Sequence, residues 1–385
     1  MKRRTWLQLP ALAFAAGNSP VDTEEHRAAY LKRMLDELCT KLGPRPSGSK
    51  AFEAGIRIAL RELKAALPQA ELDEVTFRRW IPVGQARLRV AGQNRETYIA
   101  DNSPGTPKGG VRGTWRAVSG GFEIADAAGR AVARVRVSEF GRAIVTLHSG
   151  EDAAPLFNVG RQDVPALNAA AEAKAAAEAE AHVRWIPNVK THSAVGTLPG
   201  DSAEEILIVA HADTKYDTPG ANDNTASLIT MLMVAHAVSG KRFKHALRFL
   251  ATTGEELTFF GAKHYAEVRR RAGTLGNVKV CINLDSLTYG PNWQVNTTDA
   301  ALASTILAIH RDLKIPAQPK VFERDDTMDS APFLAGGART VHLNSRGDDA
   351  RTLPLWHRPE DEAETIEPRF VENSFRVLLE LVGRL

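Results

Sequence analysis

The second half of the chain alternates short apolar runs with stretches of helical spacing. The apolar runs have the length of buried strands, and the stretches between them place apolar residues three or four positions apart. The expected strands are Ile206–Ala210, Ala246–Thr252, Val278–Leu284 and Thr340–Leu343, and the expected helices are Thr225–Val238, Phe260–Arg271 and Ala300–Leu313. This alternation predicts an α/β fold, a mostly parallel mixed sheet with helices on both faces. Ligands of such sheets bind beyond the carboxyl ends of the strands.

The first part of the chain shows two further patterns. Helical spacing over Thr23–Leu38 and Ala51–Leu67 is interrupted by the Pro- and Gly-rich segment Lys41–Ser49, which cannot continue a helix. From Leu72 to about Pro199 the pattern changes to short alternating runs between turn-rich pieces. We therefore expect a large unit made of residues 22–75 and 200–385, with a smaller β-rich domain, residues 76–199, inserted into it.

Within the inserted piece, the expected strands include Ala86–Val90, Ala131–Val137 and Ala143–Leu147. The Ala/Glu-rich stretch Pro165–Ala181 begins with proline and continues with strong helix formers, so it predicts a surface helix.

The first 17 residues have the layout of a secretory signal peptide. Basic residues Lys2–Arg4 precede the mostly apolar Trp6–Ala16, which offers small-residue cleavage sites and is too short for a permanent membrane anchor. The paired arginines resemble a twin-arginine export signal, which implies a periplasmic or secreted bacterial protein. The alternative is a cytosolic protein with an ordinary basic N-terminus. No other segment is long enough to cross a membrane.

Composition narrows the possible functions. Apolar residues make up 43% of the 385-residue chain, charged residues 25%, and the net charge is +3. No basic block extends beyond Arg269–Arg271, so nothing indicates nucleic-acid binding. The only cysteines, Cys39 and Cys281, are expected to be buried thiols rather than a disulfide. A metal in this protein must therefore be held by His, Asp and Glu.

Such residues follow three of the expected strands. His211 comes directly after the first strand, Glu255 and Glu256 come after the second, and Asp285 follows the third. Asp223 precedes the helix that begins near Thr225, where capping and the helix dipole favour a carboxylate. Each motif alone is a weak signal. Because parallel strands present their carboxyl ends at one edge of a sheet, the motifs after these three strands together predict a metal site.

The order of these motifs resembles a known family. His-x-Asp, Gly-x-x-Asp-Asn, Gly-Glu-Glu, Asn-Leu-Asp and a late His-x-x-Glu-Asp are similar to the co-catalytic zinc exopeptidases of the M28 aminopeptidase family. Leu42–Ser49 is similar to an N-terminal motif of that family. The resemblance covers roughly residues 25–75 and 200–385. The piece between is similar to the protease-associated domain of some members, in a reduced and poorly matched form.

The resemblance implies a centre with two zinc ions per chain. In this centre His211 and Asp285 hold one ion, Glu256 and His357 hold the other, Asp223 bridges them, and Glu255 is the general base.

Elementary chemistry agrees with these implied roles. Two neighbouring metal ions need a carboxylate with two oxygens to span them. Asp213 lies where it could accept from the second ring nitrogen of His211. Neighbouring residues on an extended chain point opposite ways, so Glu255 and Glu256 can have different roles.

The sequence also departs from the family pattern. Thr225–Ser227 replaces the usual small residues ending in Gly, Met328–Ser330 replaces Ser-Asp-His, and Trp356 stands near the last ligand where some members have tyrosine. The remaining histidines of the expected helices and strands are interpreted as structural, with His342 the one whose distance from the site needs checking; the others are His236, His245, His264 and His310.

The resemblance therefore implies a zinc-dependent exopeptidase that removes N-terminal residues from peptides. A two-metal-activated water would attack the peptide, with Glu255 as general base. Alternatives are a carboxypeptidase or dipeptidase of the same family, or a non-catalytic binding protein on the peptidase scaffold. Glutaminyl cyclases are disfavoured because they use one zinc. Side-chain preference depends on the loops Thr288–Trp293 and Glu323–Asp329, and the sequence indicates neither this preference nor the oligomeric state.

Overall fold

The computed structural model describes residues 19–138, 141–150, 153–316, 319–324, 328–345 and 355–385. The expected leader, residues 1–17, lies outside these ranges. The α-helices are α1 (Glu24–Leu35), α2 (Lys50–Ala66), α3 (Val164–Glu172), α4 (Ala226–Ala237), α5 (Phe260–Arg271), α6 (Ala300–Asp312), α7 (Ala331–Leu334) and α8 (Pro368–Arg384). No helix within the described ranges has the length and apolar character needed to cross a membrane.

One continuous hydrogen-bonded sheet contains all the strands. They are β1 (Gln69–Val90), β2 (Gln93–Arg95), β3 (Tyr98–Ile99), β4 (Val111–Val118), β5 (Gly121–Ala125), β6 (Ala131–Val137), β7 (Leu156–Val159), β8 (Ala176–Leu198), β9 (Glu205–His211), β10 (Ala246–Thr252), β11 (Val278–Leu284), β12 (Trp293–Asn296), β13 (Lys320–Phe322) and β14 (Arg339–Ser345).

The centre of this sheet is parallel. Strands β10, β9, β11 and β14 lie side by side in that order and run in one direction. On one side β8 pairs antiparallel with β10, and on the other β12 pairs antiparallel with β14. The predicted α/β fold with a mostly parallel mixed sheet is therefore confirmed for this part of the chain.

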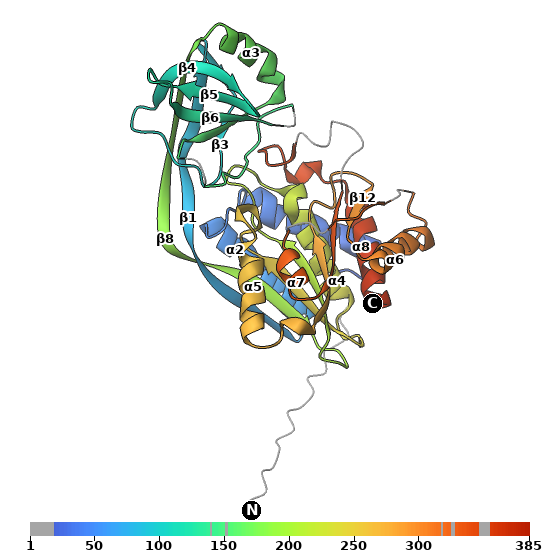
Figure 1. Cartoon of the computed structure of the whole chain (residues 1–385). Coiled ribbons are helices and arrows are strands. Elements are labelled where there is room, and N and C mark those ends of the chain that lie inside the picture. The colour runs from blue at the N-terminus through green and yellow to red at the C-terminus, as the bar shows by residue number, and fades with distance from the viewer. Residues whose placement is uncertain (1–18, 139–140, 151–152, 317–318, 325–327, 346–354) are drawn as a thin grey trace, which may run out of the picture.

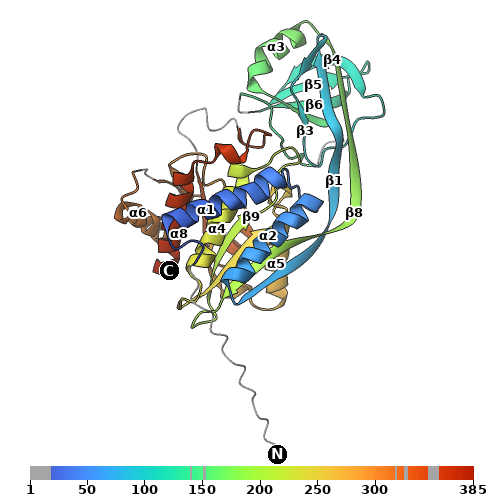
Figure 2. The same cartoon turned by 180° about the vertical axis from the view of Figure 1, so that it is seen from behind.

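Both faces of the parallel strands are covered by helices, as the continuous apolar character of these strands requires. Along β9, Ile206, Ile208 and Ala210 belong to one core, and the intervening Leu207 and Val209 belong to another. The first core is closed by α1, α2, α4 and α8, which lie together in front of the sheet in Figure 2. The second lies under α5 and α7, on the opposite face in Figure 1.

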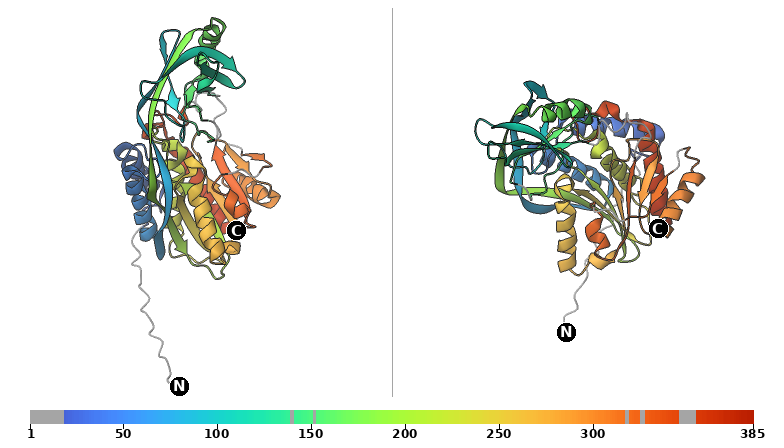
Figure 3. Two further views of the ribbon diagram at one scale, coloured as in Figure 1. Left: turned by 60° about the vertical axis from the view of Figure 1, so that its left-hand side comes forward. Right: turned by 45° about the horizontal axis from the view of Figure 1, so that its top comes forward.

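Strands β1 and β8 form a long two-stranded arm. They span 22 and 23 residues and pair antiparallel along most of their length. Near α2 the arm lies beside the parallel strands, where β8 pairs with β10. At its far end it carries β2–β7 and α3 (Figures 1 and 3). This β-rich unit has a core of its own that includes Trp115, Phe157 and Leu167. The predicted boundary after residue 75 falls inside β1, and the one after residue 199 falls just beyond β8. Both boundaries stay predictions.

Two expectations for this unit were wrong. Residues 143–147 do not form a strand, since only Leu147 makes an isolated bridge, to Asp101. The helix expected over Pro165–Ala181 ends at Glu172, and Ala176 already begins β8. The small side chains of Ala177, Ala179 and Ala181 pack into the core of the unit. Alternation of buried alanine with polar residues therefore outweighs the helix propensity of the segment.

The helices of the first part begin where side chains can cap them. Thr23 accepts a hydrogen bond from the N–H of His26, and Ser49 accepts one from Phe52. Cys39 and Cys281 are both buried and free, which confirms the interpretation as buried thiols.

Candidate metal centre

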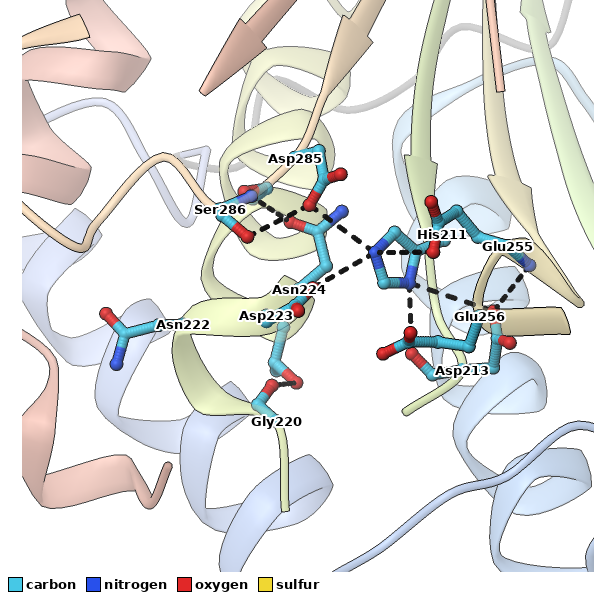
Figure 4. A network of polar contacts seen from close by, with 12 residues as sticks. His211, Asp213, Gly220, Asn222, Asp223, Asn224, Glu255, Glu256, Asp285 and Ser286 are labelled. Atoms are coloured by element: carbon cyan, nitrogen blue, oxygen red, sulfur yellow. Dashed lines mark hydrogen bonds and ion pairs between the residues drawn. The ribbon is translucent and has the colours of Figure 1, made fainter. Parts of the chain in front are cut away.

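The carboxyl ends of three parallel strands meet at the candidate site. His211 is the last residue of β9, Asp285 follows β11 directly, and the turn η4 (Glu255–Leu257) follows β10. Figure 4 shows the imidazole of His211 pointing toward Asp285 and Asp223. The sheet edge expected from the sequence therefore does gather these side chains.

One group of potential ligands surrounds His211. Its Nε2 lies 3.2 Å from Asp223 Oδ1, 3.5 Å from Asp285 Oδ1 and 3.8 Å from Glu255 Oε2. His211, Glu255 and Asp285 thus form a cluster whose ligand atoms could hold one metal ion.

A second group surrounds His357. Its Nε2 lies 3.2 Å from Asp223 Oδ2 and 3.2 Å from Glu256 Oε2, and these three residues form a second cluster of potential ligands. Asp223 therefore directs one oxygen toward each histidine. A carboxylate in this position can bridge two metal ions.

The local backbone differs from the sequence-based expectation at two points. Glu255 and Glu256 lie in a 3₁₀ turn rather than an extended segment, but their carboxylates still belong to different clusters. Asp223 does not cap α4, which begins at Ala226 with Thr225 as the residue before it. Both oxygens of Asp223 face histidines instead.

The second nitrogen of His211 is held by the chain of Asp213, although not mainly by its carboxylate. Nδ1 lies 3.0 Å from the Asp213 main-chain oxygen and 3.7 Å from Asp213 Oδ1. The carboxylate instead accepts from the Glu255 N–H at 3.3 Å and from the Ser47 hydroxyl at 3.0 Å. Asp213 therefore positions both the imidazole of His211 and the turn that carries Glu255.

Asp361 fixes the loop that carries Asp223. It accepts the N–H groups of Asn222 at 2.9 Å and Asp223 at 3.0 Å, and the Asn222 side-chain amide at 2.8 Å. The sequence placed Asp361 in the late His-x-x-Glu-Asp motif but assigned it no role. The peptide between Asp223 and Asn224 is cis.

The β-rich unit reaches the site at two places that sequence reasoning missed. His357 Nδ1 lies 2.9 Å from the main-chain oxygen of Val145, and the buried ammonium of Lys215 lies between Glu256 and Asp101. Val145 and Asp101 are far from these partners in the sequence, so no local pattern could have indicated the contacts. Trp356 stacks on the ring of His357 with centroids 3.9 Å apart.

A cavity of about 180 Å³ adjoins Glu256 and Asp213. Trp80 of β1, Tyr216 and Leu257 contribute to its walls. Tyr216 also donates a hydrogen bond to the main-chain oxygen of Ile99, at 2.8 Å. The arm and the β-rich unit therefore form one wall beside the candidate site. Two loops were expected to set side-chain preference. One of them, Glu323–Asp329, is described only in part, because residues 325–327 lie outside the described ranges.

Burial and neighbouring charges separate the acid–base properties of the two glutamates. Burial raises the pKa of Glu255 well above its usual range, and the nearby Asp285 adds to the effect. Burial also acts to raise the pKa of Glu256, but Lys215 and His357 outweigh it and lower that pKa. For His357, burial is outweighed by Glu256 and Asp223, which raise its pKa to about 9. The two neighbours thus differ in their affinity for a proton.

The ligands around His211 suit a zinc ion, and one observation indicates this without the family resemblance. His211 Nε2 is buried and makes no hydrogen bond to any residue that the structure describes, although three carboxylate oxygens lie within 3.8 Å of it. A buried ring nitrogen in this state requires an explanation, and a metal ion between it and these oxygens provides one. Imidazole and carboxylate are also ordinary zinc ligands.

The remaining histidines that the sequence singled out make structural contacts. His236 lies 3.4 Å from Glu62, and His310 packs edge-on against Trp293. His342 lies 2.9 Å from the Asn283 side-chain nitrogen and belongs to neither ligand cluster. His245 and His264 lie near Glu204 and Asp73.

A largely parallel α/β sheet with two adjoining clusters of potential metal ligands at its carboxyl edge is the arrangement expected of a metal-dependent α/β enzyme. Residues 193–382 match the profile of Peptidase family M28, so this part of the chain is an M28 peptidase domain.

Sequence relatives include aminopeptidase YwaD of Bacillus subtilis, 26% identical over 178 residues, which are 44% of this chain and 38% of that protein. A probable leucine aminopeptidase 2 of Aspergillus oryzae is 29% identical over 113 residues, 29% of this chain and 22% of that protein. The chain thus matches well under half the length of either relative.

Solved structures match nearly the whole chain in fold. A zinc aminopeptidase from Bacillus subtilis superposes with a TM-score of 0.73 at 18% identity, covering 93% of this chain and 94% of that one. A peptidase M28 precursor from Shewanella amazonensis gives a TM-score of 0.74 at 18% identity, covering 93% and 95%. Because each match covers 93% of this chain, it includes most of the β-rich unit and its arm. The likeness over the whole chain supports the predicted α/β fold class.

Proposed function

We propose that this protein is a zinc-dependent exopeptidase that removes N-terminal residues from peptides. The observation that carries the proposal is the pair of ligand clusters joined by Asp223, with one oxygen 3.2 Å from a histidine nitrogen of each cluster. The aminopeptidase names of the sequence relatives support the direction of attack from the N-terminus.

The contacts support two proposed metal positions. His211 and Asp285 would hold one zinc ion, Glu256 and His357 would hold the other, and Asp223 would belong to both. When bound, two zinc ions polarise the scissile carbonyl and lower the pKa of the attacking water. Asp213, Val145 and Asp361 keep the histidines and the Asp223 loop in place through the hydrogen bonds described above.

Glu255 is the proposed general base. Its side chain lies on the His211 side of the site and is somewhat more exposed than that of Glu256, 10% against 6%. Burial raises its pKa, which favours acceptance of a proton. A Glu255 carboxylate oxygen takes one proton from the attacking water as the C–O bond forms. It returns that proton to the amine nitrogen as the C–N bond breaks.

The substrate class separates the alternatives experimentally. Zinc-loaded protein is expected to hydrolyse aminoacyl 4-nitroanilides that have a free amino group and to leave their N-acetylated forms intact. Cleavage of N-blocked peptides at a free carboxyl end would favour the carboxypeptidase alternative, and cleavage of dipeptides alone would favour a dipeptidase. Peptide binding with no hydrolysis of any substrate, at full zinc loading, would favour the non-catalytic binding protein.

We further propose that the protein works outside the cytoplasm on peptide substrates. Support comes from Lys2–Arg4 and the apolar stretch that follows them. N-terminal sequencing of protein from its native source should give a mature start close to residues 13–17. Intact Met1–Ala16 in the soluble native protein would contradict the proposal.

A further inference from the structure

Lys215 is a buried cation beside only one of the two metal positions. It lies in the loop after β9 and is 3% exposed. Its Nζ donates to the Glu256 main-chain oxygen at 2.7 Å and lies 3.1 Å from Glu256 Oε2. The same Oε2 atom lies 3.2 Å from His357 Nε2. Lys215 therefore shares a carboxylate oxygen with the cluster of Asp223, Glu256 and His357.

The other side of Lys215 is held by the β-rich unit. Asp101 Oδ2 lies 3.2 Å from Nζ, and Asp101 is 4% exposed. The main chain of Asp101 is fixed in turn, because its N–H bonds to the Thr146 oxygen and its oxygen accepts from His148, both at 2.8 Å. Neither charge can move into solvent without disturbing this packing. The pair is therefore a fixed part of the electrostatic surroundings of Glu256.

The two metal positions differ in whether a buried cationic side chain lies beside their carboxylates. Among the residues that the structure describes, no lysine or arginine forms an ion pair with Asp285, Glu255 or Asp223; their ion-pair partners there are His211 and His357. A buried ammonium repels a second cation strongly, because the surroundings screen charge less than water does. It also competes for the lone pairs of Glu256 Oε2. Asp101 supplies a negative charge on the far side of the ammonium and offsets part of its field.

We infer that the Asp101–Lys215 pair makes the two metal positions unequal. Lys215 weakens zinc binding at the position formed by Asp223, Glu256 and His357, and Asp101 limits this weakening. Zinc therefore fills the His211–Asp285 position first, and the second ion is the exchangeable one. The inference rests on the two-zinc centre of the proposed function. It also gives the β-rich unit a role, because Asp101 belongs to that unit.

Two substitutions with opposite expected signs test the inference. Lys215→Met removes the positive charge and keeps an unbranched side chain, so the second zinc should bind about tenfold more tightly. Asp101→Asn removes the compensating negative charge with little change in shape, so the second zinc should bind about tenfold more weakly. The double variant should bind close to the wild-type value. Purely structural damage would weaken zinc binding in every variant.

The measurement is a zinc titration of the metal-free full-length protein in chelator-buffered solution, followed by calorimetry and by zinc content. Glu256→Ala identifies the second step, since it removes a ligand of that position alone. Circular dichroism checks that each variant is folded, and Lys215→Gln replaces Lys215→Met if the latter does not fold. Weaker second-step binding in a folded Lys215 variant, or no shift with either substitution, would overturn the inference. Wild-type protein that binds no zinc would instead contradict the proposed function.

Discussion

Replacement of Glu255 by alanine is expected to lower kcat by about 10²–10⁴-fold while both zinc ions stay bound. The carboxylate of Glu255 is proposed to accept the proton of the attacking water. Within the described part of the chain, only its main-chain N–H takes part in the hydrogen bonds around the ligands, and alanine keeps that group. KM should change little, because a base that acts in the transition state contributes little to binding of the ground state. Steady-state kinetics on an aminoacyl anilide, with zinc content measured on the same sample, checks the prediction.

Glu256→Ala is the matched control. Glu256 lies next to Glu255 in the same turn, but its Oε2 lies 3.2 Å from His357 Nε2. Its loss should lower the affinity for zinc at one metal position, and excess zinc should restore part of the activity. The reverse pattern, with zinc lost from Glu255→Ala and kept by Glu256→Ala, would exchange the two assigned roles. Unchanged hydrolysis in both variants would place the site elsewhere.

Replacement of Asp223 by alanine is expected to weaken both zinc positions and to reduce hydrolysis to the detection limit. One carboxylate serves both clusters, since its two oxygens each lie 3.2 Å from a different histidine. Loss of a residue that hydrogen-bonds to a ligand lowers metal affinity by about 10–100-fold. Loss of a ligand that serves both positions should lower zinc affinity by more than this. Zinc content after dialysis, together with activity at saturating zinc, measures the effect.

Asp361→Asn provides the graded comparison for this prediction. Asp361 holds the loop through the N–H groups of Asn222 and Asp223 but belongs to neither ligand cluster. Zinc affinity should therefore fall by only about 10–100-fold. An Asp223→Ala protein that keeps one tightly bound zinc would show that the two positions do not share this residue.

The sequence predicted the peptidase part of the fold well, because buried parallel strands leave a clear pattern. The expected strand Val278–Leu284 and helix Phe260–Arg271 match β11 and α5 at both ends. His211, Glu256 and Asp285 could be placed at one edge because each follows such a strand closely. His357 lies in an irregular segment after residues outside the described ranges, and only the family resemblance indicated it.

The arm and its contacts with the site could not be predicted in the same way. Along most of β1, exposed and half-buried positions follow one another, because both faces of the arm are partly open to solvent. The regular alternation by which a strand is normally recognised is therefore missing. Lys215, Asp101 and Val145 meet the ligands only through tertiary packing. Their roles follow from distances and burial that no local sequence pattern encodes.

A zinc titration of metal-free protein, with hydrolysis of an aminoacyl anilide followed in the same samples, tests the central claim most directly. The account predicts no activity without metal and full activity only as bound zinc approaches two ions per chain. It also predicts that Asp223→Ala fails both to bind zinc tightly and to hydrolyse the substrate. Full hydrolysis by the metal-free protein, or full activity with a single tightly bound ion and an empty second position, would contradict the two-metal account.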